Sequence, residues 1–205
     1  MIPLLLIGGG SHCRSCIDVI EWMGVYAVAG IVGPSSGGEP SVFGYPILGE
    51  DRDLPELLRT TPHALVAVGQ ISAPQPRMRL FTHARGLGAL FPVLVSPEAY
   101  VSKRASVGAG SILMHGAVVN AAANIGENCI INSQALVEHD VEVGSHVHVS
   151  TGVRLNGGVV VGEGTFIGSG SVVHQGVVIG SNCVISAGTV VSAEVPSNST
   201  LRRQA

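Results

Sequence analysis

Residues 119–137 read VNAAANIGENCIINSQALV, and every sixth residue from Val119 to Val137 is Val or Ile. The same spacing extends from Val101 to Val191, where sixteen successive positions hold Val, Ile or Leu. A period of six is neither the period of about 3.6 residues of an α-helix nor the two-residue alternation of a β-strand. It predicts a solenoid built from short repeated units.

A second position of each unit is also restricted, because the fourth residue after each periodic Val, Ile or Leu is small or is Val. Each six-residue unit is therefore expected to direct one large and one small side chain inward. Three units close a triangular coil of 18 residues, and the sixteen units stack into about five coils. Cys129 and Cys183 stand at the small position, so both are predicted to fill the core.

The chain before the repeat alternates predicted strands with predicted helices, which indicates an α/β domain with a small Rossmann-like parallel sheet. The expected strands are 4–7, 25–32, 64–68 and 90–95, the expected helices are 13–23, 51–59 and 76–87, and 33–46 is an expected loop. Ligands of such sheets bind beyond the carboxyl ends of the strands. We place the domain boundary between residues 95 and 96, which gives an α/β domain over 1–95 and a β-helix domain over 96–205.

The composition narrows the range of functions. Charged residues are only 12% of the 205 residues and the net charge is −3, which gives no indication of binding to nucleic acid or to an anionic membrane. The apolar run 2–7 is too short for a signal peptide and no segment is long enough to cross a bilayer, so a cytoplasmic protein is expected. Cys13 and Cys16 form a single C-x-x-C in an expected helix, which favours a structural role over redox chemistry or a zinc site.

A glycine-rich loop, Gly8 to Gly10, follows the first expected strand. It lacks the complete dinucleotide-binding pattern, because Cys13 stands where a third glycine is needed and Gly33-Pro34 stands where an acidic residue is needed. Two interpretations remain open for this loop: a phosphate-binding turn at a helix N-terminus, or a plain tight turn.

One segment of the repeat, residues 132–150, is dense in polar and ionisable groups. It holds three of the eight histidines of the chain, and His139 and His148 fall at outward positions of their units. His139 is followed directly by Asp140, and a carboxylate beside an imidazole keeps the ring basic and oriented. The pair is therefore a candidate general base.

Several features occur together in a characteristic order: the loop G-G-x-H at 9–12, the repeat, V-E-H-D at 137–140 and H-V-H-V-S at 146–150. In this combination the chain resembles the sialic acid O-acetyltransferase (NeuD-like) family and the related nucleotide-amino-sugar N-acetyltransferases of bacterial glycan pathways, which are hexapeptide-repeat acyltransferases. The resemblance extends from Leu4 to about Val195. It implies a left-handed parallel β-helix that binds acetyl-CoA, an N-terminal domain that binds the sugar nucleotide, and a homotrimer with active sites between adjacent subunits.

The resemblance also implies the reaction, in which acetyl-CoA is the cosubstrate and the amine of a nucleotide-linked 4-amino-4,6-dideoxy sugar is acetylated. His139 then acts as the general base, Asp140 raises its basicity, and His148 donates a hydrogen bond to the acetyl carbonyl. Transfer is direct, without an acyl-enzyme, and no metal is expected. The other implied contacts are Gly157, Ser169 and Ala187 for the pantetheine of acetyl-CoA, and Gly10, Ser11, His12, Gln70 and Asn132 for the sugar nucleotide.

The chain departs from the family pattern where the nucleotide base is read. Gly33-Pro34-Ser35 replaces the acidic pair that often follows the second strand, so the choice among UDP, GDP and dTDP stays open. O-acetylation of sialic acid or a related sugar also stays open, because the same base can serve a hydroxyl group. A non-catalytic scaffold is disfavoured, since it would not need the His139-Asp140 pair or His12.

A zinc lyase of the γ-class carbonic anhydrase type is a more remote alternative. Those enzymes share the β-helix and bind zinc through histidines contributed across a trimer interface. The available ligands would be His115, His139, His146 and His148, but the pair of histidines five residues apart that those enzymes use on one chain is absent.

Overall fold

The computed structural model describes residues 1–35 and 38–202, which form two compact units. The first unit comprises residues 1–69 and 76–94, and the second comprises residues 70–75 together with the chain from residue 95 onward. The short segment 70–75 is thus flanked in sequence by the first unit but makes its contacts with the second. None of the described helices is both long and apolar enough to cross a membrane.

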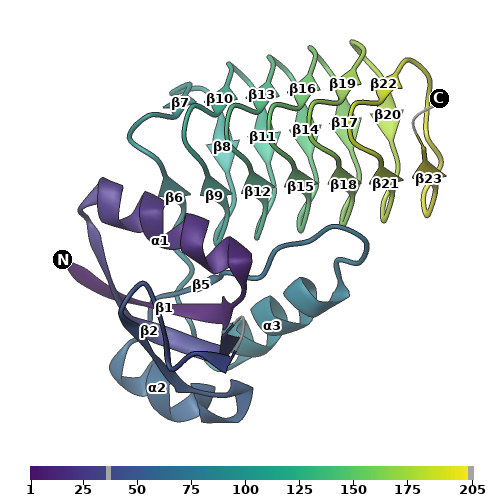
Figure 1. Cartoon of the computed structure of the whole chain (residues 1–205). Coiled ribbons are helices and arrows are strands. Elements are labelled where there is room, and N and C mark those ends of the chain that lie inside the picture. Colours follow the sequence, from purple (N-terminus) through teal and green to yellow (C-terminus); the bar gives the residue numbers. More distant parts are fainter. Residues whose placement is uncertain (36–37, 203–205) are drawn as a thin grey trace. The chain divides into compact units, whose positions relative to one another are not determined.

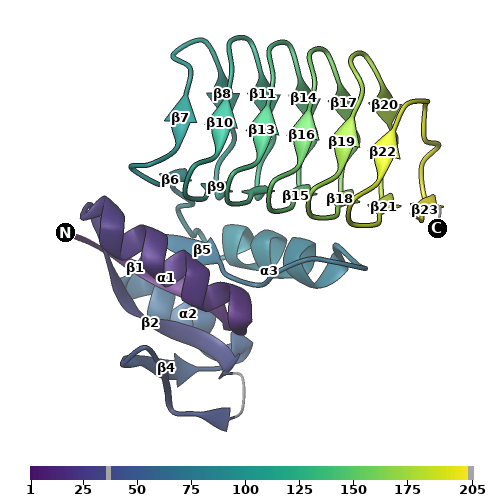
Figure 2. The ribbon, with the colours of Figure 1, turned by 45° about the horizontal axis from the view of Figure 1, so that its top comes forward.

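The first unit is built on one five-stranded sheet (Figure 2). Its strands are β1 (Ile2–Gly9), β2 (Tyr26–Ser35), β3 (Ser41–Val42), β4 (Tyr45–Gly49) and β5 (Ala64–Val66), and its helices are α1 (Ser11–Met23), the 3-10 turn η2 (Asp51–Asp53), α2 (Leu54–Thr60) and α3 (Gln75–Gly86). The strand order is β3-β4-β2-β1-β5, and every pair except β3–β4 is parallel. The α/β fold class predicted for this part of the chain is confirmed.

The core of the first unit is the apolar run of β1. Residues 4–7 are each at most 1% exposed, because β1 is a central parallel strand with both faces covered. Cys13 and Cys16 of α1 are fully buried, and burial raises their thiol pKa values to about 11 and about 12. Both thiols therefore remain protonated at neutral pH, as expected for cysteines with a structural role.

The predicted strand over 90–95 is wrong in its extent and its partner. Only Leu94–Val95 (β6) is a strand, and it joins the sheet of the repeat beside β9 (Ile112–Leu113). Leu90 forms an isolated bridge with His63 instead. The six-residue period could have assigned this strand, because Val95 stands six residues before Val101 and 18 residues before Leu113.

The predicted loop over 33–46 contains secondary structure as well. It includes the end of β2, strand β3 and the start of β4, with Phe43 (φ 51°) and Gly44 (φ 84°) forming the tight turn between β3 and β4. Ser36 and Gly37 of this stretch lie outside the described residues. The error arose because β3 is only two residues long and sits among turn-forming residues.

The second unit is a left-handed parallel β-helix, in which two-residue strands alternate with four-residue turns (Figure 1). The β13 sheet contains β7 (Tyr100–Val101), β10 (Val118–Val119), β13 (Leu136–Val137), β16 (Arg154–Leu155), β19 (Val172–Val173) and β22 (Val190–Val191). The β14 sheet contains β8 (Ser106–Val107), β11 (Asn124–Ile125), β14 (Glu142–Val143), β17 (Val160–Val161) and β20 (Val178–Ile179). The β15 sheet contains β6, β9, β12 (Ile130–Ile131), β15 (His148–Val149), β18 (Phe166–Ile167), β21 (Val184–Ile185) and β23 (Thr200–Leu201).

The periodic residues form the core of this β-helix. From Leu113 to Val191 each of them is at most 4% exposed, and Cys129 and Cys183 at the small position are fully buried. Each strand pairs in register with the strand one coil away, as Val119 pairs with Val137. The predicted hexapeptide architecture, with two inward side chains per unit, is confirmed.

Glycine often follows a periodic residue directly, as in Val143-Gly144 and Val161-Gly162, and the reason is the close approach of neighbouring coils. A Cβ atom on Gly162 would lie 2.4 Å from the backbone nitrogen of Ser181 in the next coil, and one on Gly126 would lie 2.6 Å from that of Ser145. No Cβ fits at such distances. Glycine is required there because the backbones of successive coils approach closely.

The turn itself depends on the third residue after each periodic residue. From Gly110 to Gly188, all fourteen of these positions have φ between 52° and 72°, in the left-handed region. Eight are glycine, and the other six are Ala122, Asn128, Gln134, Asp140, His146 and Asn182. Left-handed backbone costs a residue with a Cβ about 1–2 kcal/mol, although Asn and Asp tolerate it better. Five of the six exceptions are consecutive, so this cost is concentrated in the stretch that carries the polar cluster.

Adjacent alanines provide a test of this strain. Ala121 and Ala122 are both exposed, but only Ala122 has a positive φ. We expect Ala122→Gly to raise the free energy of unfolding by about 0.5–1 kcal/mol, because it relieves the left-handed strain, and Ala121→Gly to lower it by about the same amount. Urea unfolding of the two variants measures both. Shifts of the same sign would contradict this account of the turn.

Candidate active site

The candidate base lies in the turn between β13 and β14. His139 Nδ1 donates a hydrogen bond to Asp140 Oδ2 at 2.8 Å, since a carboxylate can only accept, and Nε2 is left with the lone pair. The backbone of the pair is fixed by the coils on either side: Asp140 N donates to Ala121 O at 3.2 Å, and His139 O accepts from Gly158 N at 2.9 Å. Both side chains remain more than half exposed.

The surroundings make His139 more basic than an ordinary histidine. The hydrogen bond to Asp140 is the largest influence on its pKa and raises it, and the charges of Asp140 and Glu138 raise it further against a lowering by desolvation. A base with a raised pKa and an exposed Nε2 is suited to accept a proton from a bound nucleophile.

Gly157 lies one coil after His139 and provides the surface on which the imidazole rests. A Cβ atom at Gly157 would be 2.6 Å from His139 Cε1 and 2.7 Å from Nε2, so the ring packs directly over the glycine. The two residues line an open groove of about 650 Å³ together with Glu138, Asn156, His174 and Gln175. Any larger residue at position 157 would displace the base from this groove.

Sequence reasoning missed four of the residues in this groove: Glu138, Asn156, His174 and Gln175. Glu138 is held in place, because its Oε2 accepts from Asn120 Nδ2 at 2.9 Å and from His139 N at 3.2 Å. The 18-residue spacing of the coils was the available signal. Asn120, Glu138, Asn156 and His174 are separated by 18 residues each, so they form one column on the β-helix surface.

His148 is placed differently from the sequence expectation of an accessible outward side chain. It projects from β15 between Ile130 and Phe166 of the neighbouring strands, yet it is only 7% exposed. Its Nδ1 donates to the backbone oxygen of Gln70 at 2.6 Å, so the segment 70–75 covers it. Nε2 faces Asn132 Nδ2 at 3.2 Å.

These contacts define the proton positions on His148. Asn132 Oδ1 accepts from Ser133 N at 2.8 Å, which directs the amide nitrogen of Asn132 toward His148. Nε2 of His148 is therefore the acceptor and Nδ1 carries the proton. The expected hydrogen bond from His148 to an acetyl carbonyl needs an N–H directed at the ligand, and the proton of Nδ1 is already committed to Gln70.

Gln70 and Asn132, both expected to contact the sugar nucleotide, belong to this covered cluster. Gln70 is 3% exposed and its Nε2 donates to Gly164 O at 3.0 Å. Its backbone and side chain thus anchor the segment 70–75 on the β-helix. Their contacts to a ligand remain predictions.

The expected pantetheine contacts fall on two different corners of the triangular coil. His139 and Gly157 follow strands of the β13 sheet, whereas Ser169 and Ala187 follow β18 and β21 of the β15 sheet. Ser169 and Ala187 are exposed and lie one coil apart, and Ser169 Oγ is 2.9 Å from Ser150 Oγ. Within one chain, the pair His139 and Gly157 and the pair Ser169 and Ala187 therefore lie on different corners.

The predicted sugar-nucleotide loop lies in the first unit, at the carboxyl end of β1. Gly10 is the N-cap of α1, and Ser11 and His12 are its first two residues. Gly8 is conformationally required, because its φ is 108° and a Cβ there would lie 2.4 Å from Val68 Cγ2. The loop thus presents a helix N-terminus at the ligand-binding edge expected for this sheet.

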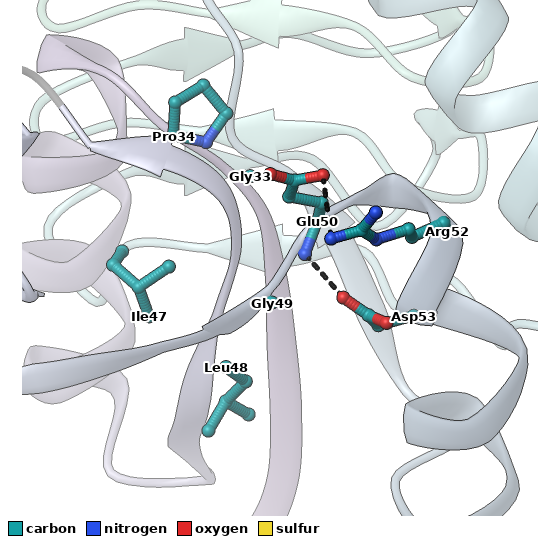
Figure 3. Close-up of a pocket in the computed structure, with 8 residues that line it drawn as sticks. All are labelled: Gly33, Pro34, Ile47, Leu48, Gly49, Glu50, Arg52 and Asp53. Carbon is teal, nitrogen blue, oxygen red and sulfur yellow. Dashed lines mark hydrogen bonds and ion pairs between the residues drawn. The ribbon is translucent and has the colours of Figure 1, made fainter.

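The first unit also has a cavity, of about 490 Å³, which lies beside the end of β2 (Figure 3). Its apolar lining comes from Pro34, Ile47 and Leu48. Its polar lining comes from η2 and the residue before it, where Glu50 N donates to Asp53 Oδ2 at 2.8 Å and the Glu50 carboxylate lies 3.5 Å from Arg52 Nη2. Gly33-Pro34 brings no carboxylate to this cavity. Glu50 and Asp53 supply carboxylates to it instead.

The histidines proposed for a zinc site lie at separate places in the chain. His115 follows β9, His139 follows β13, His146 precedes β15, and His148 is within β15. Among residues 1–35 and 38–202, no group of three or more His, Cys, Asp or Glu side chains is arranged to hold a metal ion.

Comparisons with known proteins cover the whole chain. The family described as PglD N-terminal domain matches residues 3–83, and the bacterial transferase hexapeptide repeat matches residues 122–157 and 158–193. The acetyltransferase domain of PglB from Neisseria gonorrhoeae FA1090, in complex with acetyl coenzyme A, is 32% identical with a TM-score of 0.90, covering 98% of this chain and 96% of that chain. The chain belongs to the hexapeptide-repeat sugar acetyltransferases.

Two further similar structures are of one enzyme from Caulobacter crescentus, PerB. PerB, in complex with CoA and GDP-perosamine, is 34% identical with a TM-score of 0.89, covering 98% of this chain and 93% of that chain. A perosamine N-acetyltransferase with one histidine replaced by asparagine is 33% identical with a TM-score of 0.90 and the same coverage. Comparison with curated protein sequences gave no significant match.

The pH dependence of this acetyltransferase tests the His139–Asp140 pair. Because Asp140 raises the pKa of His139, Asp140→Asn lowers that pKa, and the acid limb of kcat/KM moves to lower pH while the plateau rate falls. Asparagine suits the left-handed backbone at this position (φ 60°), so the turn is preserved. Glu163→Gln, an exposed carboxylate on another corner, serves as the control. An unshifted acid limb in Asp140→Asn would remove Asp140 from the mechanism.

Proposed function

We propose that this acetyltransferase transfers the acetyl group of acetyl-CoA to the amine of a nucleotide-linked 4-amino-4,6-dideoxy sugar, in the cytoplasmic synthesis of bacterial surface glycans. The observation that carries the proposal is the His139–Asp140 pair, whose exposed imidazole lines an open groove. The comparisons add support, because the PglB domain is an acetyltransferase in complex with acetyl coenzyme A and PerB is in complex with CoA and GDP-perosamine, a nucleotide-linked amino sugar.

In the proposed reaction the amine nitrogen of the sugar attacks the thioester carbonyl of acetyl-CoA. Nε2 of His139 accepts a proton from that nitrogen, and Asp140 stabilises the imidazolium that forms. The tetrahedral intermediate then expels the sulfur, which takes the proton from His139 and leaves as CoA thiol. Neither a metal nor an acyl-enzyme enters this sequence.

We assign His148 to positioning and not to the acetyl carbonyl. Its Nδ1–H is donated to Gln70 O and its Nε2 is occupied by Asn132, so the ring joins three segments of the second unit. This role departs from the one implied by family resemblance. In this role, His148 keeps Asn132 oriented and the segment 70–75 in place.

The cavity beside β2 is proposed to hold the nucleotide base. Glu50 and Asp53 supply carboxylates that accept hydrogen bonds, Arg52 supplies donors, and Ile47 and Leu48 supply apolar surface. Guanine presents N–H donors on one edge and two acceptors on another, whereas uracil presents carbonyl oxygens on both sides of its single N–H. The lining therefore suits guanine better, and a GDP-linked sugar is expected to be the preferred substrate.

A direct test uses a panel of UDP-, GDP- and dTDP-linked 4-amino sugars with acetyl-CoA, followed by thiol release. We expect transfer with the wild-type chain, fastest with the GDP-linked sugar, and a loss of about 10²–10⁴-fold in His139→Ala. His83→Ala, an exposed histidine on α3, is the matched control. Near-normal turnover of His139→Ala would contradict the assignment of the base, and acetylation of a sugar hydroxyl but no amine would favour the O-acetyltransferase alternative.

The two corners that carry His139 with Gly157 and Ser169 with Ala187 are proposed to meet between subunits of a homotrimer. In a ring of three copies, the corner of one copy that carries His139 would face the corner of the next copy that carries Ser169. Each such pair of corners would form one complete binding site. Acetyl-CoA would then lie in the groove between adjacent subunits.

Subunit mixing tests this arrangement. His139→Ala removes the base from one corner, and Ser169→Trp blocks the other corner with a bulky side chain. Each variant alone is expected to be inactive, whereas co-expressed chains should recover part of the wild-type activity, because some interfaces in the mixed trimers combine two intact corners. No recovery in a verified mixed trimer would indicate that each site is built within a single chain.

A further inference from the structure

We propose that the Glu138 carboxylate binds the positively charged ammonium group of the substrate and so selects an amine over a hydroxyl. This inference rests on the proposed function and deepens it, because it concerns the nucleophile accepted by the same groove. Glu138 directly precedes His139 in the chain and lines the groove with His139 and Gly157.

The carboxylate is held in one orientation. Asn120 Nδ2 donates to Oε2 at 2.9 Å from the preceding coil, and the backbone nitrogen of His139 donates to the same oxygen at 3.2 Å. Within residues 1–35 and 38–202, Oε1 of Glu138 has no hydrogen-bond partner. A half-buried carboxylate with one oxygen fixed and the other open to a groove is preorganised to accept a further hydrogen bond.

The charges around the groove favour a cation at this oxygen. Asp140 is committed to His139 Nδ1, so its charge is paired with the ring that becomes positive during the reaction. Glu138 is the other carboxylate of the groove, and its charge is not paired with any cation of the described residues. The other titratable group is His174, which lies two coils from Glu138 with Asn156 between them in the same column.

The Glu138 carboxylate can distinguish a sugar amine from a sugar hydroxyl by charge. An alkyl amine is an ammonium ion at neutral pH, and a charge-assisted hydrogen bond to a carboxylate is about twice as strong as a neutral one. A sugar hydroxyl brings no charge to offset the desolvation of Glu138. The groove therefore binds the amino sugar in preference to the corresponding hydroxy sugar.

The protons balance with Glu138 as a binding group and His139 as the base. The ammonium, R–NH₃⁺, binds to Glu138 and loses one proton to solvent to become R–NH₂. On attack, the nitrogen gives a second proton to His139 Nε2, which passes it to the departing sulfur. The products are R–NH–acetyl, CoA thiol and one proton in solution, and Glu138 is unchanged.

The test is Glu138→Gln, which keeps the size of the side chain and its acceptor for Asn120 but removes the charge. We expect KM for the amino sugar to rise about 10–100-fold, the range of a lost hydrogen bond to a charged group. KM for acetyl-CoA should stay within about threefold. The fall in kcat should be much smaller than in Asp140→Asn, because the charge of Glu138 raises the pKa of His139 less than the hydrogen bond of Asp140 does. Glu142→Gln is the matched control, because Glu142 is an exposed carboxylate on β14 that does not line the groove. Inhibition by the 4-hydroxy analogue should change little in Glu138→Gln. The variant would then bind the amino sugar and the hydroxy sugar about equally well.

Three results would overturn this assignment. An unchanged KM for the amino sugar in Glu138→Gln would show that the carboxylate does not bind the ammonium. A fall in kcat with an unchanged KM would show that Glu138 serves His139 instead. Wild-type activity with a hydroxyl and with no amine would overturn the proposed function as well, whereas the first two results leave that function intact.

Discussion

The in-register stacking of one coil on the next is the constraint on which the rest of the second unit depends. Each strand pairs with the strand 18 residues away, and the periodic Val, Ile and Leu side chains of all coils pack into one continuous core. A residue on the surface of one coil therefore lies beside the residues 18 positions before it and 18 positions after it in the sequence. Chemistry on this surface is arranged in columns, and Asn120, Glu138, Asn156 and His174 form such a column beside His139.

The candidate active site lies on turns of this solenoid whose backbone conformation has an energetic cost. Asp140 must have left-handed backbone at the position where most units have glycine, and the four other consecutive exceptions occupy the same stretch. Asp is among the few residues that tolerate this backbone, so Asp140 both forms the turn and orients the imidazole of His139. The groove is completed by Gly157, where the absence of a side chain leaves room for the imidazole.

The repeat made the β-helix, its inward residues and the exposed His139–Asp140 pair predictable from the sequence, because each depends on residues close together or on a constant spacing. The misplaced features depend on contacts between distant residues that follow no period. Gln70 and His148 are 78 residues apart, and nothing in either segment indicates that one covers the other. β6 is an exception, because its Val95 stands six residues before Val101 and so continues the period of the repeat. The position of Glu138 in the groove is predictable from the 18-residue spacing that it shares with Asn120 and Asn156.

The segment 70–75 has a consequence for how genes of this kind can recombine. A crossover at the apparent end of the α/β domain would transfer the periodic part of the chain without the six residues that cover His148 and hydrogen-bond to Gly164. The transferred β-helix would keep its core, but the His148 ring would lose the acceptor of its Nδ1 proton. The second unit is thus not one continuous stretch of gene, and an exchange that preserves the covered cluster has to carry a substitute for these six residues.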